Sequence, residues 1–331
     1  MRRVAILTTI IALGWSAYWL AGFKAQQSLL DTLVAQQRAA GWTIDIANLK
    51  TAGYPNRFDT TFTGLHVADP AGIWAWDAPA FQIMALSYKP NHIIAAWPGK
   101  HVVTVNGARY SFESDTARAS VRFAPTPRLP LERVQLEATR NRLDGPNGMK
   151  ATTDLFTLAI AKDGETAQYK LYTALKGGVP AKQWRDVIDP DKLLPDTITA
   201  ITLDSRLRFN RAWDRLSVGA EAPELQEIRV TKLSLDWGDV TVTGEGSATV
   251  GMDGYLQGAF TIHVENWKTL FDTAQAAGFV PEDNAGKIHY GIRLMAALGD
   301  NPENVTIPLK FANGNSYFGP LVIAEAPRLP Y

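Results

Sequence analysis

The chain has 331 residues and a mass of 36.3 kDa. It contains 33 basic and 33 acidic side chains, 46% hydrophobic residues and no cysteine, a composition typical of a globular protein rather than a disordered one. Zero net charge gives no reason to expect nucleic-acid binding, which needs a surplus of Lys and Arg. The lack of cysteine excludes disulfides, zinc ribbons, iron–sulfur clusters and thiol catalysis.

The first segment is typical of a membrane anchor. Val4 to Phe23 carries no charge and is long enough, at about 20 residues, to cross a hydrocarbon core of about 30 Å as a helix. Arg2 and Arg3 precede it, and only Lys24 follows it directly. This charge bias favours a cytoplasmic N-terminus and export of the remainder.

A cleaved signal peptide is the alternative interpretation of this segment. Cleavage requires small residues one and three positions before the cut, and the candidate sites place Phe23 or Trp15 at the distal position. The apolar run also exceeds the length of about 7–15 residues that is usual for a signal-peptide core. We therefore predict an uncleaved signal-anchor, in which residues 1–24 form a cytoplasmic tip and a transmembrane helix.

Residues 25–41 predict a stalk helix continuous with the anchor. Their apolar side chains recur at helical spacing, and Gly41 provides a natural end to the helix: Leu29, Leu30, Leu33 and Val34. Two turns of such a stripe are too short for a coiled coil. We therefore expect the stripe to pack against the following domain.

After Gly41 the sequence alternates between apolar and polar residues with a period of two. Ala119, Val121 and Phe123, for example, alternate with Arg118, Ser120 and Arg122, as in antiparallel strands with one buried and one wet face. Four dipeptides are suited to tight hairpin turns: Asn106-Gly107, Asp163-Gly164, Asp253-Gly254 and Asn313-Gly314. The pattern predicts about 15–18 short strands.

Helices are expected mainly near the C-terminus, over Trp267 to Ala277 and Asn284 to Ala297, with a shorter one near Ala181 to Ile188. Glycines and a proline near residue 177 suggest a boundary between a first β-rich half, 42–176, and a second, 177–331. The predicted class is mainly β (α+β), with large curved antiparallel sheets, an N-terminal transmembrane helix and two late helices packed on the sheet.

The search for catalytic chemistry yields little. The five histidines form no closely spaced pair of the kind that binds metal. Asp236 and Asp239 could chelate a cation or act as acid and base, but the Asp-Trp-Gly-Asp sequence favours a solvated turn. We therefore predict no catalytic residue, no metal site and no cofactor, and a protein that is not an enzyme.

Two groups of residues are candidates for ligand binding. Arg118, Arg122, Arg206 and Arg208 could bind a phosphate or carboxylate, although interleaved acids favour a solvated face with cross-strand ion pairs. Trp74 and Trp76 lie on one face of a predicted strand, where they could stack on a ligand or fill a sheet core, and the core is favoured.

The apolar content of two strands points to a different kind of ligand. Phe81 to Leu86 and His92 to Trp97 are almost wholly apolar apart from one polar residue each. If the sheet curls without closing, the apolar side of these strands needs a cover, and a lipid acyl chain would provide one.

Several motifs carry a resemblance to a known family. They are the anchor, the segment Gly53 to Phe58, the segment Asp253 to Gly258, the helix that ends in Ala277-Gly278-Phe279-Val280-Pro281, and the closing Asn313-Gly314 with Phe318-Gly319-Pro320-Leu321. The sequence resembles domain-of-unknown-function family 2125, an uncharacterised family of membrane-anchored envelope proteins of Gram-negative bacteria. More remotely it is similar in style to AsmA-like proteins, whose curved sheets with an apolar groove imply lipid handling.

These inferences predict a single-pass inner-membrane protein with a cytoplasmic N-terminus and most of the chain in the periplasm. Its expected function is non-enzymatic lipid binding or shielding in an apolar β-groove, with the inner membrane as a partner through Val4 to Phe23 and no nucleic acid. Two alternatives stay open: a cell-envelope scaffold that binds other envelope proteins, and a hydrolase with an unrecognised site.

Overall fold

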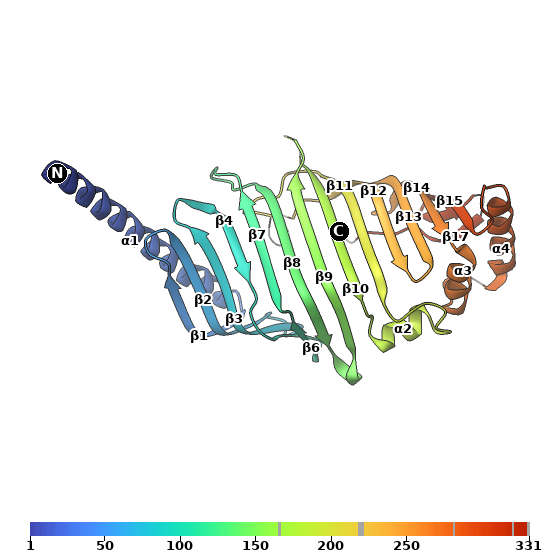
Figure 1. Ribbon diagram of the computed structural model, residues 1–331, viewed down its shortest axis with the longest axis horizontal. Coiled ribbons are helices and arrows are strands. Elements are labelled where there is room, and N and C mark those ends of the chain that lie inside the picture. The colour runs from blue at the N-terminus through green and yellow to red at the C-terminus, as the bar shows by residue number, and fades with distance from the viewer. Residues whose placement is uncertain (165–166, 218–221, 281, 320, 330–331) are drawn as a thin grey trace.

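A computed structural model describes residues 1–164, 167–217, 222–280, 282–319 and 321–329. Among these residues it contains one antiparallel sheet of 17 strands, whose strands lie side by side along the length of the molecule (Figure 1). An N-terminal helix extends from one end of the sheet, and two late helices lie at the other end. The predicted fold class is confirmed. Pro281 and Pro320, which belong to the motifs of the family resemblance, lie outside the described residues.

The first part of the chain contains helix α1 (Arg2–Ala39), nine strands and a short 3₁₀ helix, Pro146–Gly148. The strands are β1 (Thr43–Ala52), β2 (Arg57–Ala68), β3 (Trp74–Leu86), β4 (Lys89–Ala96), β5 (His101–Val105), β6 (Ala108–Glu113), β7 (Thr116–Phe123), β8 (Leu131–Asp144) and β9 (Lys150–Lys162).

The second part contains three helices, α2 (Lys182–Ile188), α3 (Trp267–Ala276) and α4 (Glu282–Ala297). Its strands are β10 (Gln168–Gly178), β11 (Ile198–Phe209), β12 (Leu225–Trp237), β13 (Val240–Val250), β14 (Leu256–Glu265), β15 (Asn304–Ala312), β16 (Asn315–Phe318) and β17 (Leu321–Glu325). All three helices begin within two residues of the positions that the sequence pattern predicts.

Local sequence explains most of the connections. Asn106-Gly107 joins β5 to β6, and Asn313-Gly314 joins β15 to β16; all four of these residues have positive φ angles, as the favoured two-residue hairpin turns require. Most strands therefore pair with their neighbours in sequence. The two predicted β-rich halves are joined by this pairing, because β9, β10 and β11 are adjacent strands of one sheet.

The sheet departs from a simple meander between β3 and β8. β3 pairs with β4 near its C-terminal end and with β5 near its N-terminal end. β8 likewise pairs with β7 along most of its length and with β6 at its end. Because β4 pairs with β7 and β5 with β6, these six strands form a closed ring within the sheet.

Strand register places apolar residues opposite one another over most of the sheet. Three rows cross it on one side, which we call the apolar face. The first row is Ile83, Ala95, Ala119, Leu136, Leu158, Thr173, Leu203, Leu233, Gly244, Ile262 and Ile307. The second is Ala85, Ile93, Val121, Val134, Ile160, Leu171, Ser205, Val230, Gly246, Phe260 and Leu309. The third is Ala117, Ala138, Phe156, Leu175, Ile201, Leu235, Val242, Val264 and Val305.

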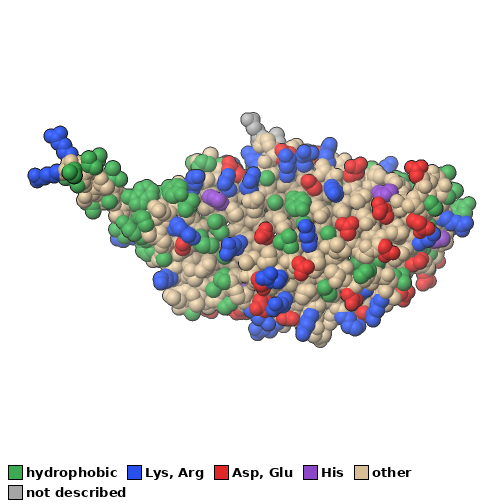
Figure 2. Space-filling view, viewed as in Figure 1, with side chains coloured by type: hydrophobic (Ala, Val, Ile, Leu, Met, Phe, Trp, Pro, Cys, Tyr) green, Lys and Arg blue, Asp and Glu red, His purple; other side chains and the backbone are tan. Residues whose placement is uncertain are grey.

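The alternate residues of the same strands form a polar face. Arg118, Glu137 and Thr157, for example, lie opposite one another on β7, β8 and β9. Figure 2 shows a face of the sheet over which Lys, Arg, Asp and Glu side chains are scattered. Sheets with one apolar and one charged side bury the apolar side against a second layer. The position of that layer determines where the sheet is left uncovered.

Helices provide the second layer mainly at the two ends of the sheet. Their principal contacts are those of α1 with β1, α3 with β13 and α4 with β15. At the N-terminal end, Leu30 of α1 packs on a cluster centred on Phe62, Leu65 and Ala78. Of the predicted stalk stripe, Leu30 and Val34 are half-buried, whereas Leu29 and Leu33 are exposed.

Candidate functional site: an apolar groove

A cavity of about 520 Å³ lies between α2 and the apolar face of β8 to β11. Its volume falls within the range of about 300–1,000 Å³ that is usual for small-molecule sites. Most of its lining side chains are aliphatic or aromatic, and those that we use below are Ala138, Phe156, Leu175, Val179, Trp184 and Ile201. We call this cavity and the adjoining uncovered rows of the apolar face the groove.

A local irregularity in β8 shapes the floor of this cavity. Arg140 has a positive φ of 46°, which interrupts the alternation of side chains along the strand. As a result Ala138 and Asn141, which an even alternation would place on opposite faces, both line the cavity. The alternation is interrupted in the same way on the adjacent, paired strand β9, since Phe156 and Thr153 both contribute to the lining.

Helix α2 forms the opposite wall and carries Trp184 into the lining. The position of α2 depends on a buried ion pair, in which Arg185 Nη2 lies 3.1 Å from Asp189 Oδ2. Asp189 is fully buried, and its carboxylate also accepts hydrogen bonds from the backbone N–H groups of Leu193 and Leu194 at 2.8 and 3.1 Å. These hydrogen bonds hold the segment that contains Leu193 and Leu194 against α2.

Three polar side chains at the cavity bond to the protein itself, and a fourth, Arg142, lies 3.8 Å from Glu113 Oε2. Ser114 donates a hydrogen bond to Asn141 Oδ1 at 2.6 Å, and the Asn141 amide donates to the Ala138 carbonyl at 3.1 Å. The Thr153 hydroxyl donates to the Lys176 carbonyl at 2.8 Å. Because these groups already have partners, the cavity suits a ligand whose buried part is apolar.

The groove continues beyond the cavity along the middle of the apolar face. The buried apolar clusters of the described residues lie at the N-terminal end, beside α2 and beneath α3 and α4. Central side chains such as Leu136, Leu158 and Leu203 belong to none of these clusters and remain partly accessible. An accessible apolar surface bordered by polar residues is a common feature of binding sites.

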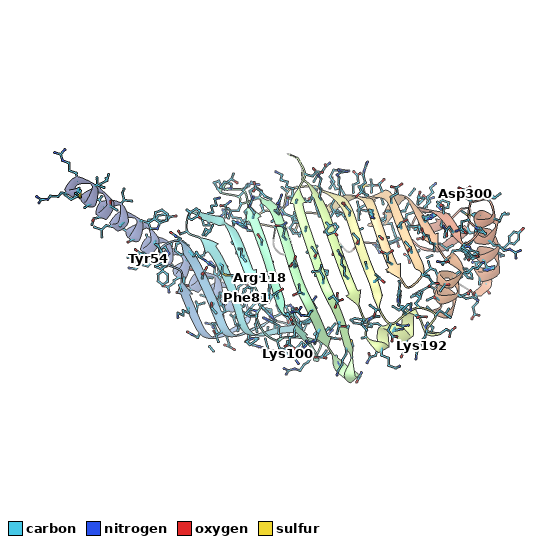
Figure 3. The ribbon with its side chains drawn as sticks, viewed as in Figure 1. Tyr54, Phe81, Lys100, Arg118, Lys192 and Asp300 are labelled. Atoms are coloured by element: carbon cyan, nitrogen blue, oxygen red, sulfur yellow. The ribbon has the colours of Figure 1, made fainter. Side chains whose placement is uncertain are left out.

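The arginines predicted as ligand candidates lie away from the groove. Arg118 and Arg122 alternate with Ala119 and Val121, which belong to the apolar face, so both arginines lie on the polar face. Figure 3 labels Arg118 and also Phe81, which lies opposite Phe62 on the adjacent strand. The structure therefore does not place Arg118 or Arg122 beside the cavity.

Arg206 and Arg208 are also on the polar face, where they form ion pairs. Arg206 Nε lies 3.1 Å from Asp163 Oδ2, and Arg208 Nε lies 3.1 Å from Glu227 Oε2. The Arg208 guanidinium is the largest cause of a lowered pKa of the Glu227 carboxyl. The Arg208 pair joins two adjacent strands, whereas Asp163 lies just after β9.

The two tryptophan candidates have aromatic neighbours within the protein. Trp76 stacks on His101 and packs edge-on against Phe81, with ring centroids 5.9 and 5.4 Å apart. Trp74 makes an edge contact with Trp42 at 5.4 Å. These rings are packed within the N-terminal part of the sheet, and neither contributes to the lining of the cavity.

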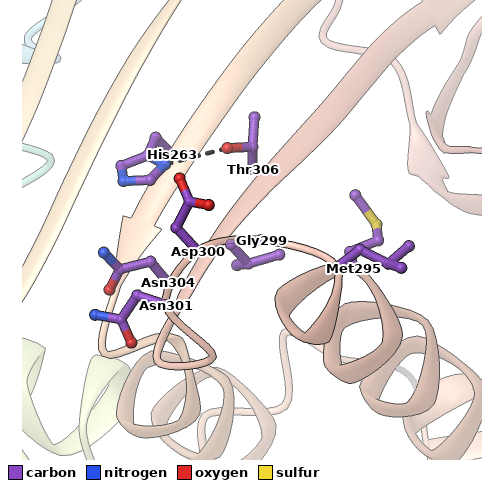
Figure 4. A pocket seen from close by; sticks show the side chains of 9 residues that line it. His263, Met295, Gly299, Asp300, Asn301, Asn304 and Thr306 are labelled. Atoms are coloured by element: carbon purple, nitrogen blue, oxygen red, sulfur yellow. Dashed lines mark hydrogen bonds between the residues drawn. The ribbon is translucent and has the colours of Figure 1, made fainter.

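A second cavity of about 410 Å³ lies near the C-terminal end of α4 (Figure 4). Its lining is more polar and includes His263, Asp300 and Asn304. The His263 ring lies 3.1 Å from the hydroxyl of Thr306. Neither cavity offers a recognised catalytic arrangement, and no three His, Cys, Asp or Glu side chains among the described residues are grouped to hold a metal ion.

The predicted carboxylate pair is part of a hairpin turn. Asp236 lies opposite Thr241, and Trp237 lies opposite Val240, so the connection between β12 and β13 consists of Gly238 and Asp239. Gly238 has a positive φ of 65°, in keeping with a tight turn. Asp239 therefore lies in the solvated turn that the sequence favours, whereas Asp236 belongs to β12 and is half-buried.

Sequence reasoning did not single out the residues that line the cavity. Phe156, Leu175 and Ile201 each follow the alternating pattern of their own strand, but nothing local shows that they face one another. Two other signals were available, the Gly177-Gly178-Val179-Pro180 junction and a tryptophan, Trp184, in the short helix predicted after it. These features mark the place where the chain leaves the sheet to form the wall of the cavity.

Together these observations define a β-rich protein with one extended sheet, an apolar groove and an N-terminal helix of 38 residues that is long and apolar enough to cross a membrane. The chain belongs to the family described as "Uncharacterized protein conserved in bacteria (DUF2125)", which matches residues 19–327. The resemblance drawn from the sequence motifs is therefore confirmed. No curated protein and no solved structure matches the chain.

Proposed function

We propose that this protein is a membrane-anchored lipid-binding protein whose groove holds acyl chains. The observation that carries the proposal is the apolar cavity of about 520 Å³ beside α2, which is continuous with the uncovered middle of the apolar face. Acyl chains match this surface because they are long, apolar and without hydrogen-bonding groups, and burying them gains about 0.8 kcal/mol per CH₂ group.

The N-terminal helix supports the choice of lipid over other apolar ligands. α1 is apolar over its first half, and the side chains of Val4, Leu7 and Ile11 are more than half exposed. In a bilayer this surface would contact lipid tails. We propose that α1 is an uncleaved inner-membrane anchor with Arg2 and Arg3 in the cytoplasm, and that the sheet lies in the periplasm as one folded unit.

The proposal can be tested on the full-length protein purified from membranes in a mild detergent. Native mass spectrometry should detect bound lipid in the wild-type protein. Leu175→Gln places a polar group in the cavity and should reduce the lipid-bound fraction several-fold. Tyr172→Gln is a matched control, because Tyr172 lies on the same strand, is 40% exposed and points to the polar face.

Three results would count against the proposal. A wild-type protein without lipid would overturn it, as would equal lipid loss in both variants or no loss in either. Recovery of a discrete crosslinked protein partner together with a lipid-free groove would instead favour the scaffold alternative, which predicts binding through strand edges or surface patches.

A further inference from the structure

The packing of α1 bears on where the sheet sits relative to the membrane. α1 meets the sheet within its apolar segment. Trp15 Nε1 donates a hydrogen bond to the Pro55 carbonyl at 2.9 Å, and Trp19 Nε1 donates to the Arg57 carbonyl at 3.0 Å. Both tryptophans belong to the apolar segment that predicts the membrane span.

Contacts with the sheet continue along the rest of the helix. Gln26 donates a hydrogen bond to the Thr60 hydroxyl at 2.8 Å, and Arg38 donates to the Ile44 carbonyl. Leu30 packs between these points on the N-terminal apolar cluster. Residues 25–39 therefore lie along the sheet.

The length of the helix before Trp15 indicates how deep in the membrane the contact between Trp15 and Pro55 would lie. An α-helix rises about 1.5 Å per residue, so Val4 to Gly14 covers only about 16 Å of a hydrocarbon core of about 30 Å. With Arg2 and Arg3 at the cytoplasmic surface, the helix must remain in lipid beyond Trp15. The loop that contacts Trp15 would then lie within the opposite leaflet.

The side chains around this contact include several tyrosines, a residue type that favours the interface end of a leaflet. Tyr54 and Tyr88 are 58% and 55% exposed, and Tyr18 is 49% exposed. Tyr18 donates a hydrogen bond to the Ser87 carbonyl at 2.7 Å, and Tyr54 pairs with the Ser16 hydroxyl at 2.7 Å. Figure 3 shows Tyr54 close to α1, at the N-terminal end of the sheet.

These aromatic side chains come from three separate parts of the chain, namely α1, the loop at Gly53–Asn56 and the turn at Ser87–Lys89. Tyrosine and tryptophan favour the membrane interface because their rings are apolar and their polar groups remain hydrated. Arg57 is half exposed and lies at the same end of the sheet, where its guanidinium pairs with Asp59 at 3.0 Å.

We propose that the loop at Gly53–Asn56 and the turn at Ser87–Lys89 are immersed in the outer leaflet of the membrane that α1 spans. This inference rests on the proposed anchoring by α1, and it deepens the proposed function by naming where lipid enters.

Phe58 stacks on Trp19 at 5.7 Å and lies opposite Ala85, which belongs to the second row of the apolar face. That row thus begins at the membrane, and acyl chains can move from the leaflet onto it without crossing water.

The chain contains no cysteine, so single spin labels can be introduced into the full-length protein without removing others. We would label Tyr54→Cys and Tyr88→Cys separately, with Met252→Cys as the control. Met252 is fully exposed in the turn between β13 and β14, far along the sheet from α1. All three positions are exposed, so the fold should tolerate each label.

The measurement is collision accessibility of the labels by electron paramagnetic resonance, in vesicles of phosphatidylethanolamine and phosphatidylglycerol. Labels at positions 54 and 88 should be accessible to oxygen and protected from a water-soluble nickel complex, whereas the label at 252 should show the reverse. Equal exposure to the nickel complex at all three positions would overturn the inference. Immersed labels together with a lipid-free groove would instead refute the lipid-binding function and leave the membrane position intact.

Discussion

Arg185 and Asp189 form an ion pair at 3.1 Å that is almost completely removed from solvent, with side-chain exposures of 9% and 0%. Arg185 also donates hydrogen bonds to the Pro195 and Leu194 carbonyls. One guanidinium thus joins the end of α2 to the segment that leads back to the sheet. Because α2 is a wall of the groove, this pair connects the stability of the fold with the shape of the candidate site.

Asp189→Ala should therefore be strongly destabilising. The substitution removes the buried partner of Arg185 and leaves only the exposed Asp196, whose Oδ1 lies 3.0 Å from Arg185 Nη1. Loss of a buried partner typically costs about 3–5 kcal/mol, and we expect a value towards the lower end because Asp196 remains. We expect a lower melting temperature and a reduced lipid-bound fraction, measured by thermal unfolding and native mass spectrometry in detergent.

A matched control for this prediction lies on the same helix. Lys182 and Asp186 form an ion pair with the same spacing of four residues, but their side chains are 80% and 44% exposed. Asp186→Ala should cost only about 0.3–0.5 kcal/mol. Equal melting temperatures for the two variants would show that the buried pair does not hold α2 in place.

A second prediction concerns glycines that lie within the apolar face. At Gly246 the φ angle is 155°, and an added Cβ would lie 2.4 Å from the Ala259 carbonyl oxygen and 2.6 Å from Phe260 Cα. Both of these atoms belong to the neighbouring strand backbone. Gly246→Ala should therefore disturb the pairing of β13 with β14 and destabilise the protein by about 1–3 kcal/mol.

Gly244→Ala tests whether the effect comes from backbone crowding. The nearest atom to a Cβ at Gly244 is Ile262 Cδ1 at 2.8 Å, the end of a flexible side chain. We expect a smaller loss, measured as the shift of the thermal unfolding midpoint of the full-length protein. A larger loss for Gly244→Ala than for Gly246→Ala would contradict this account.

Sequence patterns were sufficient for the local structure of this protein. Alternation with a period of two predicted the strands, and turns such as Asn106-Gly107 predicted hairpins, because both signals depend on neighbouring residues. The apolar stripe that begins at Trp267 predicted α3 for the same reason. The approximate number of strands, the hairpin turns and the late helices could therefore be obtained without a structure.

The groove could not be predicted in the same way, because it depends on pairs that are distant in the sequence. Leu136 and Leu203 share one row only because of the registers of the strands between them. The contact between Trp15 and Pro55 joins residues 40 positions apart. The four candidate arginines were predicted as ligand-binding residues because their side chains can bind anions. The alternation of side chains places them on the polar face, opposite the groove.

A third prediction follows from His101, which is buried at the end of the aromatic cluster around Trp76. Burial is the largest influence on the pKa of its imidazole and lowers it below the ordinary value of 6.5. Above about pH 6.5 the ring is neutral in both the folded and the unfolded chain. Below that pH His101 takes up a proton more readily in the unfolded chain than in the folded chain.

His101 should therefore reduce stability progressively as the pH falls from about 6.5 through the pKa of the folded protein. We expect His101→Gln to weaken the pH dependence of the unfolding free energy over this range, measured by denaturant titration in detergent between pH 5 and 8, with His263→Gln as the control. A pH dependence identical to that of the wild type would show that His101 does not contribute to it.

The last prediction distinguishes the two faces of the sheet. Arg208→Gln removes the ion pair with Glu227 on the polar face, and the lowered pKa of the Glu227 carboxyl should rise towards its ordinary value because Arg208 is the main cause of the shift. Exposed pairs contribute little, so the stability should change by no more than about 1 kcal/mol.

If acyl chains occupy the groove, Arg208→Gln should also leave the lipid-bound fraction unchanged, whereas Leu175→Gln reduces it. If the arginines instead bind lipid phosphate, Arg208→Gln should lower the bound fraction of anionic lipid most strongly and Leu175→Gln should have little effect. Native mass spectrometry of both variants with phosphatidylglycerol and phosphatidylethanolamine separates these outcomes. The apolar lining of the cavity and the ion pairing of Arg208 favour the first.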